Sequence, residues 1–288
     1  MTGAKKLRAL MQAPDIIAAP GVFDGLTARL VEQAGFAAAY MTGAGTSASK
    51  GYPDFGLLTL TEMAENAGVI TRTIGLPLIS DADTGYGNEL NVTRTVGEFE
   101  RRGVAAIHIE DQVSPKRCGH LDGKEVVSRE EFVIKIEAAV AARRDPDFMI
   151  IARTDSRAVI GFDEALARAN AALAAGADMA FVEAVQTAEE MAAVPKRVKG
   201  PCLLNMVGGG KTPPISIPDA QALGYRVAIV PGAVLGPVIK AADEALRRLK
   251  ETQMLPPAKP GTGPMDTFRR FGADEWNSLR RTPAKTGA

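Results

Sequence analysis

The chain is poor in the residues that most often carry metal or redox chemistry, since its 288 residues include two cysteines and two histidines. Cys118 and Cys202 are too few for a disulfide framework, so we predict a reducing compartment and a cytoplasmic protein. No apolar run reaches the ~18 residues that a membrane span needs, and no apolar stretch follows Lys5, Lys6 and Arg8 as it would in a signal peptide. A membrane partner is therefore not expected.

An excess of charge is also lacking, because 34 basic and 34 acidic residues give a formal net charge of zero. Proteins that bind nucleic acid usually carry a basic patch, so we expect no nucleic-acid partner. The hydrophobic fraction of 46% is enough for a large core, and the length suits a single α/β barrel.

Short apolar runs, rich in Ile, Val, Leu, Ala and Met, alternate with longer segments in which apolar residues recur at helical spacing. The apolar runs are Ile16–Ala19, Ala37–Met41, Leu76–Ser80, Ala105–Ile109, Met149–Ala152, Met179–Val182, Leu203–Met206 and Val227–Val230. The helical segments are Leu26–Ala34, Leu60–Ile74, Asn91–Arg102, Arg129–Arg144, Phe162–Ala175, Ala188–Val198 and Pro218–Leu223. Runs with so little alternation are typical of strands covered on both faces. Eight such strands joined by helices predict an α/β fold, a (β/α)8 TIM barrel.

The chain continues past the predicted barrel. A helical pattern over Val234–Glu251 is followed by a polar connector, Pro256–Pro264, and by an aromatic segment, Met265–Arg281. We predict a single domain over residues 1–288, with the barrel and a closing helix in 1–255 and a linker and docking segment in 256–288. The tail is apolar enough to dock, either on its own barrel or on a neighbouring subunit.

Polar residues follow the predicted strands at one end, where parallel barrels place their active sites. In chain order these residues are Thr42, Gly43, Ala44, Asp81, Asp83, Glu110, Arg153, Glu183 and Asn205. Asp81 and Asp83 are two residues apart and can point to the same side of a strand end. With Glu110 they predict an oxygen-rich pocket suited to Mg2+, which takes one or two carboxylates and keeps several waters. Alternatively, one aspartate of the pair caps the loop backbone. His108, inside an apolar strand, is interpreted as a hydrogen-bonded core histidine.

The loop after the fourth strand contains Lys116-Arg117-Cys118-Gly119-His120. Two cations beside a thiol are expected to lower the pKa of Cys118, and a neighbouring imidazole can move protons. By itself this motif is open to redox, nucleophilic and metal-binding interpretations. A hard-metal site beside it favours Cys118 as a proton donor.

Gly208-Gly209-Gly210-Lys211-Thr212 looks like the end of a phosphate-binding P-loop. However, Pro213-Pro214 stand where the helix of that motif should begin, so we predict no nucleotide site there. Cys202, at the start of the seventh apolar run, is interpreted as a packed core thiol.

Taken together, these residues make the chain resemble the isocitrate lyase / phosphoenolpyruvate mutase superfamily over nearly its full length. The resemblance depends on five motifs, namely Gly51-Tyr52-Pro53-Asp54, Asp81-Ala82-Asp83-Thr84-Gly85-Tyr86-Gly87, His108-Ile109-Glu110-Asp111-Gln112, Lys116-Arg117-Cys118-Gly119-His120 and Ala152-Arg153-Thr154-Asp155. It implies a Mg2+-dependent barrel, with Mn2+ as a substitute metal, that acts on a small dicarboxylate. It also implies a homotetramer whose subunits exchange a C-terminal helix.

The cysteine loop resembles that of the carbon–carbon lyases of this superfamily, which act on isocitrate, 2-methylisocitrate and 2,3-dimethylmalate. Methylisocitrate lyases usually have Arg after the loop histidine, whereas this chain has Leu121, and residues 205–213 resemble dimethylmalate lyases and oxaloacetate hydrolases. The implied activity is cleavage of the C2–C3 bond of a 2-alkylmalate-type substrate, or of 2-methylisocitrate, to an α-oxo acid such as pyruvate and a carboxylic acid. The alternatives are an oxaloacetate hydrolase, a phosphonopyruvate or carboxyphosphonoenolpyruvate mutase-type enzyme, and a barrel that only binds dicarboxylates.

This reading assigns a role to each candidate residue. The metal ligands are expected to be Asp81, Asp83 and Glu110, supported by Asp54. The substrate is expected to contact Tyr40, Thr42, Gly43, Ala44, Gly119, Glu183 and Asn205. Cys118 is expected to protonate the carbanion as a general acid, with help from Lys116 and His120, while Arg153 neutralises charge near the breaking bond. The pocket for the alkyl group is expected to be shaped by Phe181, Met206 and Val207.

Overall fold

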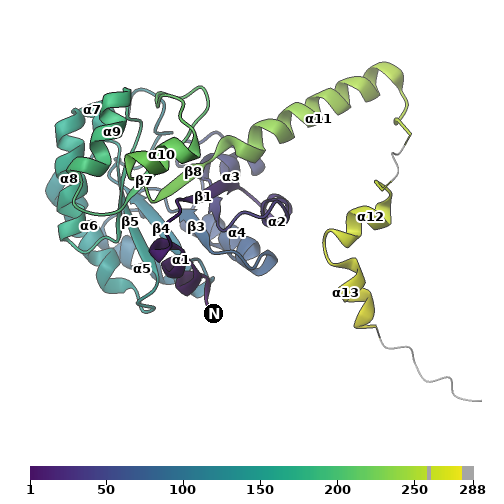
Figure 1. Cartoon of the computed structure of the whole chain (residues 1–288), viewed down its shortest axis with the longest axis horizontal. Coiled ribbons are helices and arrows are strands. Elements are labelled where there is room, and N and C mark those ends of the chain that lie inside the picture. The colour runs from purple at the N-terminus through teal and green to yellow at the C-terminus, as the bar shows by residue number, and fades with distance from the viewer. Residues whose placement is uncertain (258–260, 281–288) are drawn as a thin grey trace, which may run out of the picture. The chain divides into compact units, whose positions relative to one another are not determined.

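The computed structural model describes residues 1–257 and 261–280. Parallel strands close into a barrel in which neighbours in the chain are neighbours in space and β1 pairs with β8 (Figure 1). The strands are β1 (Ile17–Val22), β2 (Ala39–Met41), β3 (Leu78–Asp81), β4 (Ala106–Glu110), β5 (Met149–Thr154), β6 (Met179–Val182), β7 (Cys202–Asn205) and β8 (Val227–Val230). The predicted (β/α)8 barrel is confirmed, with small differences at the strand ends.

Helices surround the barrel, and every predicted crossover helix is present (Figure 1). They are α1 (Gly3–Gln12), α2 (Gly25–Gln33), α3 (Gly43–Ser49), α4 (Leu60–Thr73), α5 (Glu89–Arg101), α6 (Arg129–Ala142), α7 (Ser156–Val159), α8 (Phe162–Ala174), α9 (Ala188–Arg197) and α10 (Ile217–Leu223). The short α3 was not predicted. It begins directly after β2 because the Thr42 hydroxyl caps it by accepting a hydrogen bond from the Gly45 N–H at 3.4 Å.

Alternate residues of each strand point into the barrel, and this parity places the polar residues. Met149 and Ile151 of β5 belong to the interior cluster, whereas Ile150 and Ala152 pack in the layer between strands and helices. The next inward position on β5 is therefore Arg153. On the other strands the same alternation makes the next inward-facing residues Thr42, Asp81, Glu110, Glu183 and Asn205.

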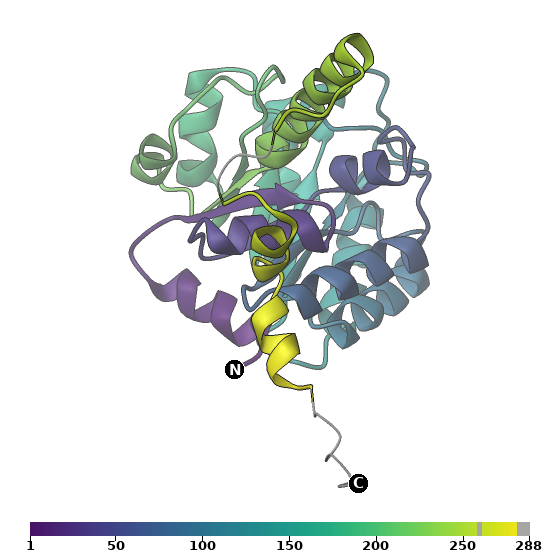
Figure 2. The same cartoon turned by 90° about the vertical axis from the view of Figure 1, so that its right-hand side faces the viewer.

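The other end of the barrel is closed by α1 (Figure 2). Leu7 of α1 is buried in the interior cluster with Ile17 and Ala105, which lie at the starts of their strands. Its apolar side chain keeps water out of the barrel floor. Polar chemistry is thereby left to the C-terminal ends of the strands.

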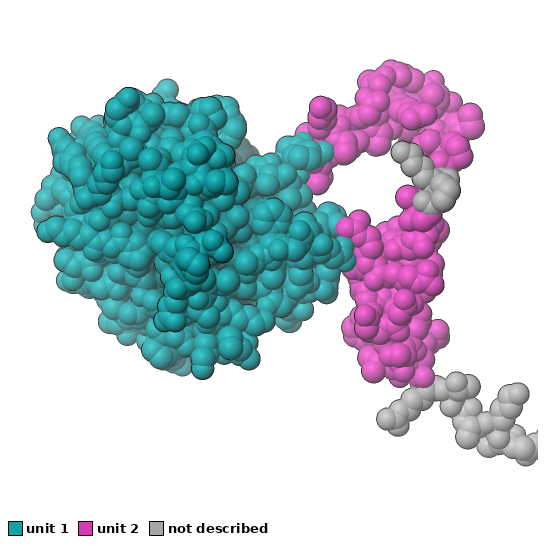
Figure 3. All heavy atoms as spheres, viewed as in Figure 1, with its two compact units in different colours: residues 1–237 teal, residues 238–288 magenta. Residues whose placement is uncertain are grey.

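The chain divides into two compact units, Met1–Pro237 and Val238–Ala288, which Figure 3 colours separately. The division falls inside α11 (Gly232–Thr252), and the second unit also holds α12 (Pro264–Arg269) and α13 (Ala273–Ser278). None of the residues of these three helices is buried. The single domain over residues 1–288 stays a prediction, and residues 258–260 of the predicted connector and 281–288 of the predicted docking segment lie outside the described part. No helix among the described residues combines the length and apolarity needed to cross a bilayer.

Candidate active site

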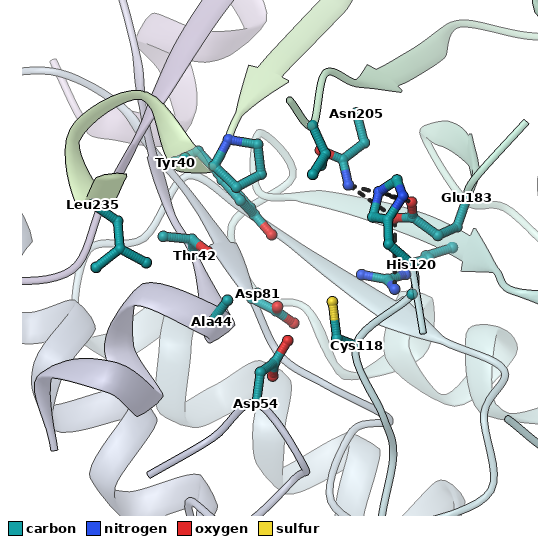
Figure 4. A pocket seen from close by; sticks show the side chains of 15 residues that line it. Tyr40, Thr42, Ala44, Asp54, Asp81, Cys118, His120, Glu183, Asn205 and Leu235 are labelled. Carbon is teal, nitrogen blue, oxygen red and sulfur yellow. Dashed lines mark hydrogen bonds and ion pairs between the residues drawn. The ribbon is translucent and has the colours of Figure 1, made fainter. Parts of the chain in front are cut away.

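A cavity of about 170 Å³ opens at the C-terminal ends of the strands (Figure 4). Its lining contains most of the predicted site residues, namely Tyr40, Thr42, Ala44, Asp54, Asp81, Cys118, Gly119, His120, Arg153, Glu183 and Asn205. The other predicted residues, Gly43, Asp83, Glu110 and Lys116, are buried behind this lining. A cavity of this size, with a mainly apolar lining and a few charged side chains, suits a small organic acid.

The lining also includes residues that sequence reasoning missed, namely Pro231, Gly232 and Leu235. Pro231 and Gly232 directly follow β8, so the strand-end rule would have found them had it been applied to the eighth run. Of the residues expected to shape the pocket, Val207 lines it. Phe181 instead lies in the barrel interior, where the Arg153 guanidinium sits 5.1 Å from its ring centroid, and Met206 is absent from the lining.

Asp81 is held at the end of β3 by two backbone donors. The Asp83 N–H donates to Oδ1 at 2.9 Å, and the Gly43 N–H donates to Oδ2 at 3.2 Å. Asp81 thus also orders the loop backbone, as the alternative interpretation of the pair allowed. A Cβ on Gly43 would lie 2.4 Å from Asp81 Oδ2, so this close approach requires glycine. Burial alone would raise the pKa of Asp81, but the nearby His108, Lys116 and Arg153 side chains lower it to about 2, and the side chain is an anion at neutral pH.

Lys116 turns its ammonium group towards carboxylates. Nζ lies 2.5 Å from Asp54 Oδ1 and 3.0 Å from Asp83 Oδ1. Burial alone would lower the pKa of Lys116, yet Asp83 and Asp81 raise it well above its ordinary value. Burial raises the pKa of Asp83 to about 6 despite this lysine. The charge of Lys116 therefore compensates the acidic cluster.

The acidic residues at the strand ends provide the kind of oxygen donors that Mg2+ prefers. Within residues 1–257 and 261–280, no three His, Cys, Asp or Glu side chains are close enough to share one metal ion. However, both carboxylate oxygens of Glu110 are buried without a hydrogen-bond partner, although Arg153 Nε lies 3.1 Å from Oε2. Burial raises the pKa of Glu110 well above its ordinary value, and a divalent cation would favour its ionised form. These hard oxygen donors fit Mg2+ bound to one or two carboxylates and otherwise through water.

Arg153 is fixed from several sides at the centre of the site. Nε lies 2.9 Å from Asp155 Oδ2, and Nη2 lies 3.5 Å from Glu183 Oε2. Burial alone would lower the pKa of Arg153, but Asp155 and Glu110 raise it well above its ordinary value. The site therefore presents a permanent, oriented positive charge.

Glu183, Asn205 and His120 form a second polar group on the opposite side of the pocket from Asp54 (Figure 4). Asn205 Nδ2 donates to Glu183 Oε2 at 3.0 Å, and His120 Nε2 lies 3.0 Å from Glu183 Oε1. Burial alone would raise the pKa of Glu183, but Arg153 and His120 lower it far below its ordinary value. Glu183 is a buried anion surrounded by donors.

Cys118 has the opposite protonation behaviour from the one expected. Burial raises the pKa of its thiol above the ordinary value. The expected lowering by adjacent cations was wrong because Lys116 pairs with Asp54 and Asp83, and the Arg117 guanidinium lies over the Phe55 ring at 5.9 Å. Cys118 points into the pocket as a neutral thiol (Figure 4).

The loop that carries Cys118 is tied to the barrel at two places. At its base, Gln112 bridges to Val126, and the Gln112 side chain both donates to Arg117 O at 2.8 Å and accepts from Arg117 N at 3.0 Å. In its middle, the buried Lys124 ammonium donates to Gly119 O and pairs with Asp155 Oδ1 at 2.9 Å. The role of Lys124 was missed, because only the fold brings it to Asp155.

Two residues set aside in the sequence analysis lie as predicted. His108 is fully buried, and its Nε2 lies 2.9 Å from the Tyr40 hydroxyl. Burial lowers the pKa of His108 to about 4, which makes it a neutral core histidine. Cys202 is buried in β7.

The Gly208–Thr212 stretch is a turn after β7, and the next helix, α10, begins only at Ile217. A P-loop requires a helix directly after its lysine and hydroxyl residue. The prediction that this stretch is no P-loop is confirmed.

Sequence comparison matches residues 7–250 to the family described as phosphoenolpyruvate phosphomutase. A 2,3-dimethylmalate lyase of Eubacterium barkeri is 47% identical over 280 residues, which cover 97% of this chain and 94% of the relative. A 2-methylisocitrate lyase of Aeropyrum pernix is 48% identical over 245 residues, covering 85% and 79%.

Solved structures agree with these sequence matches. Oxaloacetate acetylhydrolase in complex with 3,3-difluorooxalacetate is 42% identical, with a TM-score of 0.93 and 96% of each chain covered. A phosphonopyruvate hydrolase complex with oxalate and Mg2+ is 31% identical, with a TM-score of 0.85, and covers 97% of this chain and 98% of that one.

Proposed function

The chain belongs to the isocitrate lyase / phosphoenolpyruvate mutase superfamily and is a carbon–carbon lyase of it; we propose that it cleaves the C2–C3 bond of a 2-hydroxy dicarboxylate of the 2,3-dimethylmalate type. The products are an α-oxo acid such as pyruvate and a carboxylic acid. The curated relatives include lyases for 2,3-dimethylmalate and for 2-methylisocitrate. Leu121 lies outside the cavity lining and is 45% exposed, and it offers no charge to a third carboxylate, which favours the dicarboxylate.

One observation carries this proposal: a half-buried, protonated thiol faces a pocket whose lining also contains the charged side chains of Asp54, Asp81, Arg153 and Glu183. Asp81 and Asp54 lie on one side, and Glu183 and Asn205 lie on the other (Figure 4). Arg153 Nη2 lies 3.5 Å from Glu183 Oε2. A redox or nucleophilic cysteine would need its thiolate, whereas burial keeps the Cys118 thiol protonated. The pocket therefore fits a reaction that consumes a proton on carbon.

Asp81, Asp83 and Glu110, supported by Asp54, would hold Mg2+ partly through water. When bound, the ion supplies Lewis-acid polarisation of the hydroxyl and carboxylate of the hydroxy-acid half. The phosphonopyruvate hydrolase relative binds Mg2+ together with oxalate, a similar pair of oxygens.

The chain's own residues complete the reaction. Tyr40, Thr42, Gly43 and Ala44 surround the hydroxy-acid half, while Gly119, Glu183 and Asn205 orient the other half. The 2-hydroxyl proton passes to the Asp54 carboxylate in the lining, the C2–C3 bond breaks with its electron pair remaining on C3, and Arg153 stabilises the charge that spreads onto the carboxylate. The Sγ–H of Cys118 then protonates C3. Lys116 supports the reaction by pairing with Asp54 and Asp83, and His120 supports it by lying against Glu183.

The experiment is a substrate panel assayed with Mg2+ for α-oxo acid release. The panel contains 2,3-dimethylmalate, other 2-alkylmalates, 2-methylisocitrate, oxaloacetate and phosphonopyruvate. Pyruvate from 2,3-dimethylmalate with the highest kcat/KM supports the proposal. Acetate and oxalate from oxaloacetate as the preferred reaction would instead identify an oxaloacetate hydrolase, for which the 42% identical acetylhydrolase structure is the precedent. Binding without turnover of any member would contradict an enzyme.

We also propose that the chain assembles as a homotetramer whose subunits exchange the helical segment after Pro237. The support is the apolar surface of that segment, since Ile239 is 52%, Leu246 65%, Phe268 58% and Trp276 72% exposed. A subunit contact would remove these exposed apolar side chains from water. Light scattering on the full chain should give four times the 30.3 kDa chain mass, and Leu246→Asp should lower it. A monomer at assay concentration would refute the tetramer.

A further inference from the structure

The glycine-rich turn after β7, residues 207–212, packs against the loop that carries Cys118. Gly210 N–H donates to Val207 O at 3.1 Å, and Gly209 has a φ of +74°, so the turn is compact. Its sequence looks like the end of a P-loop, but the next helix, α10, begins only at Ile217. Its nearest functional neighbour is the His120 imidazole.

The turn contacts His120 through its backbone. The Lys211 N–H donates to His120 Nδ1 at 3.0 Å. Because Nδ1 accepts this hydrogen bond, the proton of the neutral ring must sit on Nε2. Nε2 lies 3.0 Å from Glu183 Oε1, and the His120 side chain is only 10% exposed. One backbone amide therefore determines that the ring nitrogen close to the buried carboxylate, Nε2, is the one that carries the proton.

Gly210 makes the room for this contact. A Cβ at position 210 would lie 2.6 Å from His120 Nδ1 and 2.9 Å from Cε1, so the ring would have to move away. At Gly208 an added Cβ would meet nothing within 4 Å. The two glycines thus form a matched pair in the same turn.

The Lys211 side chain also reaches the Cys118 loop, where Nζ pairs with Asp122 Oδ1 at 2.5 Å. The Asp122 side chain is 93% exposed. Exposed ion pairs of this kind contribute little to fixing a geometry. The backbone amide of Lys211 and the missing side chain of Gly210 are the parts of the turn that act on the ring.

We propose that the 207–212 turn is a positioning element for His120, in which the Lys211 amide selects the Nε2–H tautomer and holds the ring against Glu183. Glu183 and Asn205 then keep their orientation towards the substrate. The expected effect on kcat rests on the proposed lyase reaction, whereas the expected tautomer of His120 is independent of that reaction.

The tautomer can be read by long-range 1H–15N NMR on histidine-labelled full-length protein without metal or substrate. Only His108 and His120 contribute signals, and His108 serves as an internal reference because it is fully buried in β4 and its Nε2 is bonded to the Tyr40 hydroxyl. We expect His120 with an unprotonated Nδ1 and a protonated Nε2 in the wild type. Gly208→Ala and Lys211→Ala should keep this pattern, and Gly210→Ala should lose it. An unchanged His120 pattern in Gly210→Ala, or an equal loss in Lys211→Ala, would overturn the proposal.

The kinetic arm uses the same variants. Misplacing a group in the site by about 1 Å can cost ~10²-fold in rate. Gly210→Ala should therefore lower kcat by about 10²-fold with a smaller change in KM, while Gly208→Ala keeps the wild-type kcat. A Gly210→Ala enzyme with wild-type kcat overturns the positioning role. If the wild type turns over no substrate, the NMR result still decides the tautomer, so failure of the proposed reaction is distinguished from failure of this inference.

Discussion

Replacing Cys118 by serine tests the proton-donor assignment directly. The change keeps a small polar side chain but removes the acidic Sγ–H. Two carboxyl groups of the lining cannot replace it, because the pKa of Asp81 is lowered to about 2 and that of Glu183 is lowered further, so both are anions. The proton of Lys116 is held between Asp54 and Asp83. The full contribution of a positioned general acid should therefore be lost.

Such an acid typically raises the reaction rate ~10²–10⁴-fold, which corresponds to a decrease of about 3 to 5 kcal/mol in the activation free energy. We expect kcat of Cys118→Ser to fall within that range in a coupled assay of pyruvate release with Mg2+ and 2,3-dimethylmalate. Cys202→Ala is the matched control, since it removes the other thiol from a buried position in β7 and should keep kcat. Wild-type kcat in a folded Cys118→Ser enzyme would refute the assignment.

The remaining predictions concern pH, metal and stability. Because the acid must be protonated and burial raises the pKa of the Cys118 thiol above its ordinary value, activity should be retained through neutral pH and lost only as pH rises through that raised pKa; a loss of activity on the acid side of an ordinary thiol pKa in the kcat profile would contradict this. Chelation should abolish turnover, and Mg2+ or Mn2+ should restore it; full activity after exhaustive chelation would exclude the metal. Gly43→Ala should weaken Mg2+ binding by calorimetry ~10–100-fold, because its Cβ displaces the Asp81 carboxylate and disturbing the support of a ligand has that effect; an unchanged Kd would show that Asp81 is no ligand. Lys124→Met should lower the free energy of unfolding by about 1.5 to 3 kcal/mol in urea, because the buried Asp155 loses one of its two cationic partners and keeps only Arg153; an unchanged midpoint would contradict a stabilising Lys124–Asp155 pair.

Much of the site could be predicted from the sequence because a parallel barrel converts order along the chain into position in space. Strands are short and apolar, and side chains alternate between their two faces. Asp81, Arg153, Glu183 and Asn205 could therefore be placed in one pocket before any contact was known. Pro231 and Gly232 obey the same rule.

Protonation and loop contacts could not be predicted in the same way. The sequence places two cations beside Cys118 and suggests a lowered thiol pKa, but it does not show which carboxylates those cations meet. Lys116 turns to Asp54, which is far away in the chain, so burial decides the thiol pKa. The contacts of Lys124 and of the 207–212 turn could not be predicted either, since their partners come from other loops.

The sequence alone therefore determined the barrel, the end at which polar residues gather and the residues available for chemistry, because these depend on local periodicity and on strand order. Only the tertiary structure decided which charges pair, which groups keep their protons and which ring nitrogen of His120 faces Glu183. Those properties depend on distances between loops and on burial, and neither is encoded in the spacing of residues along the chain.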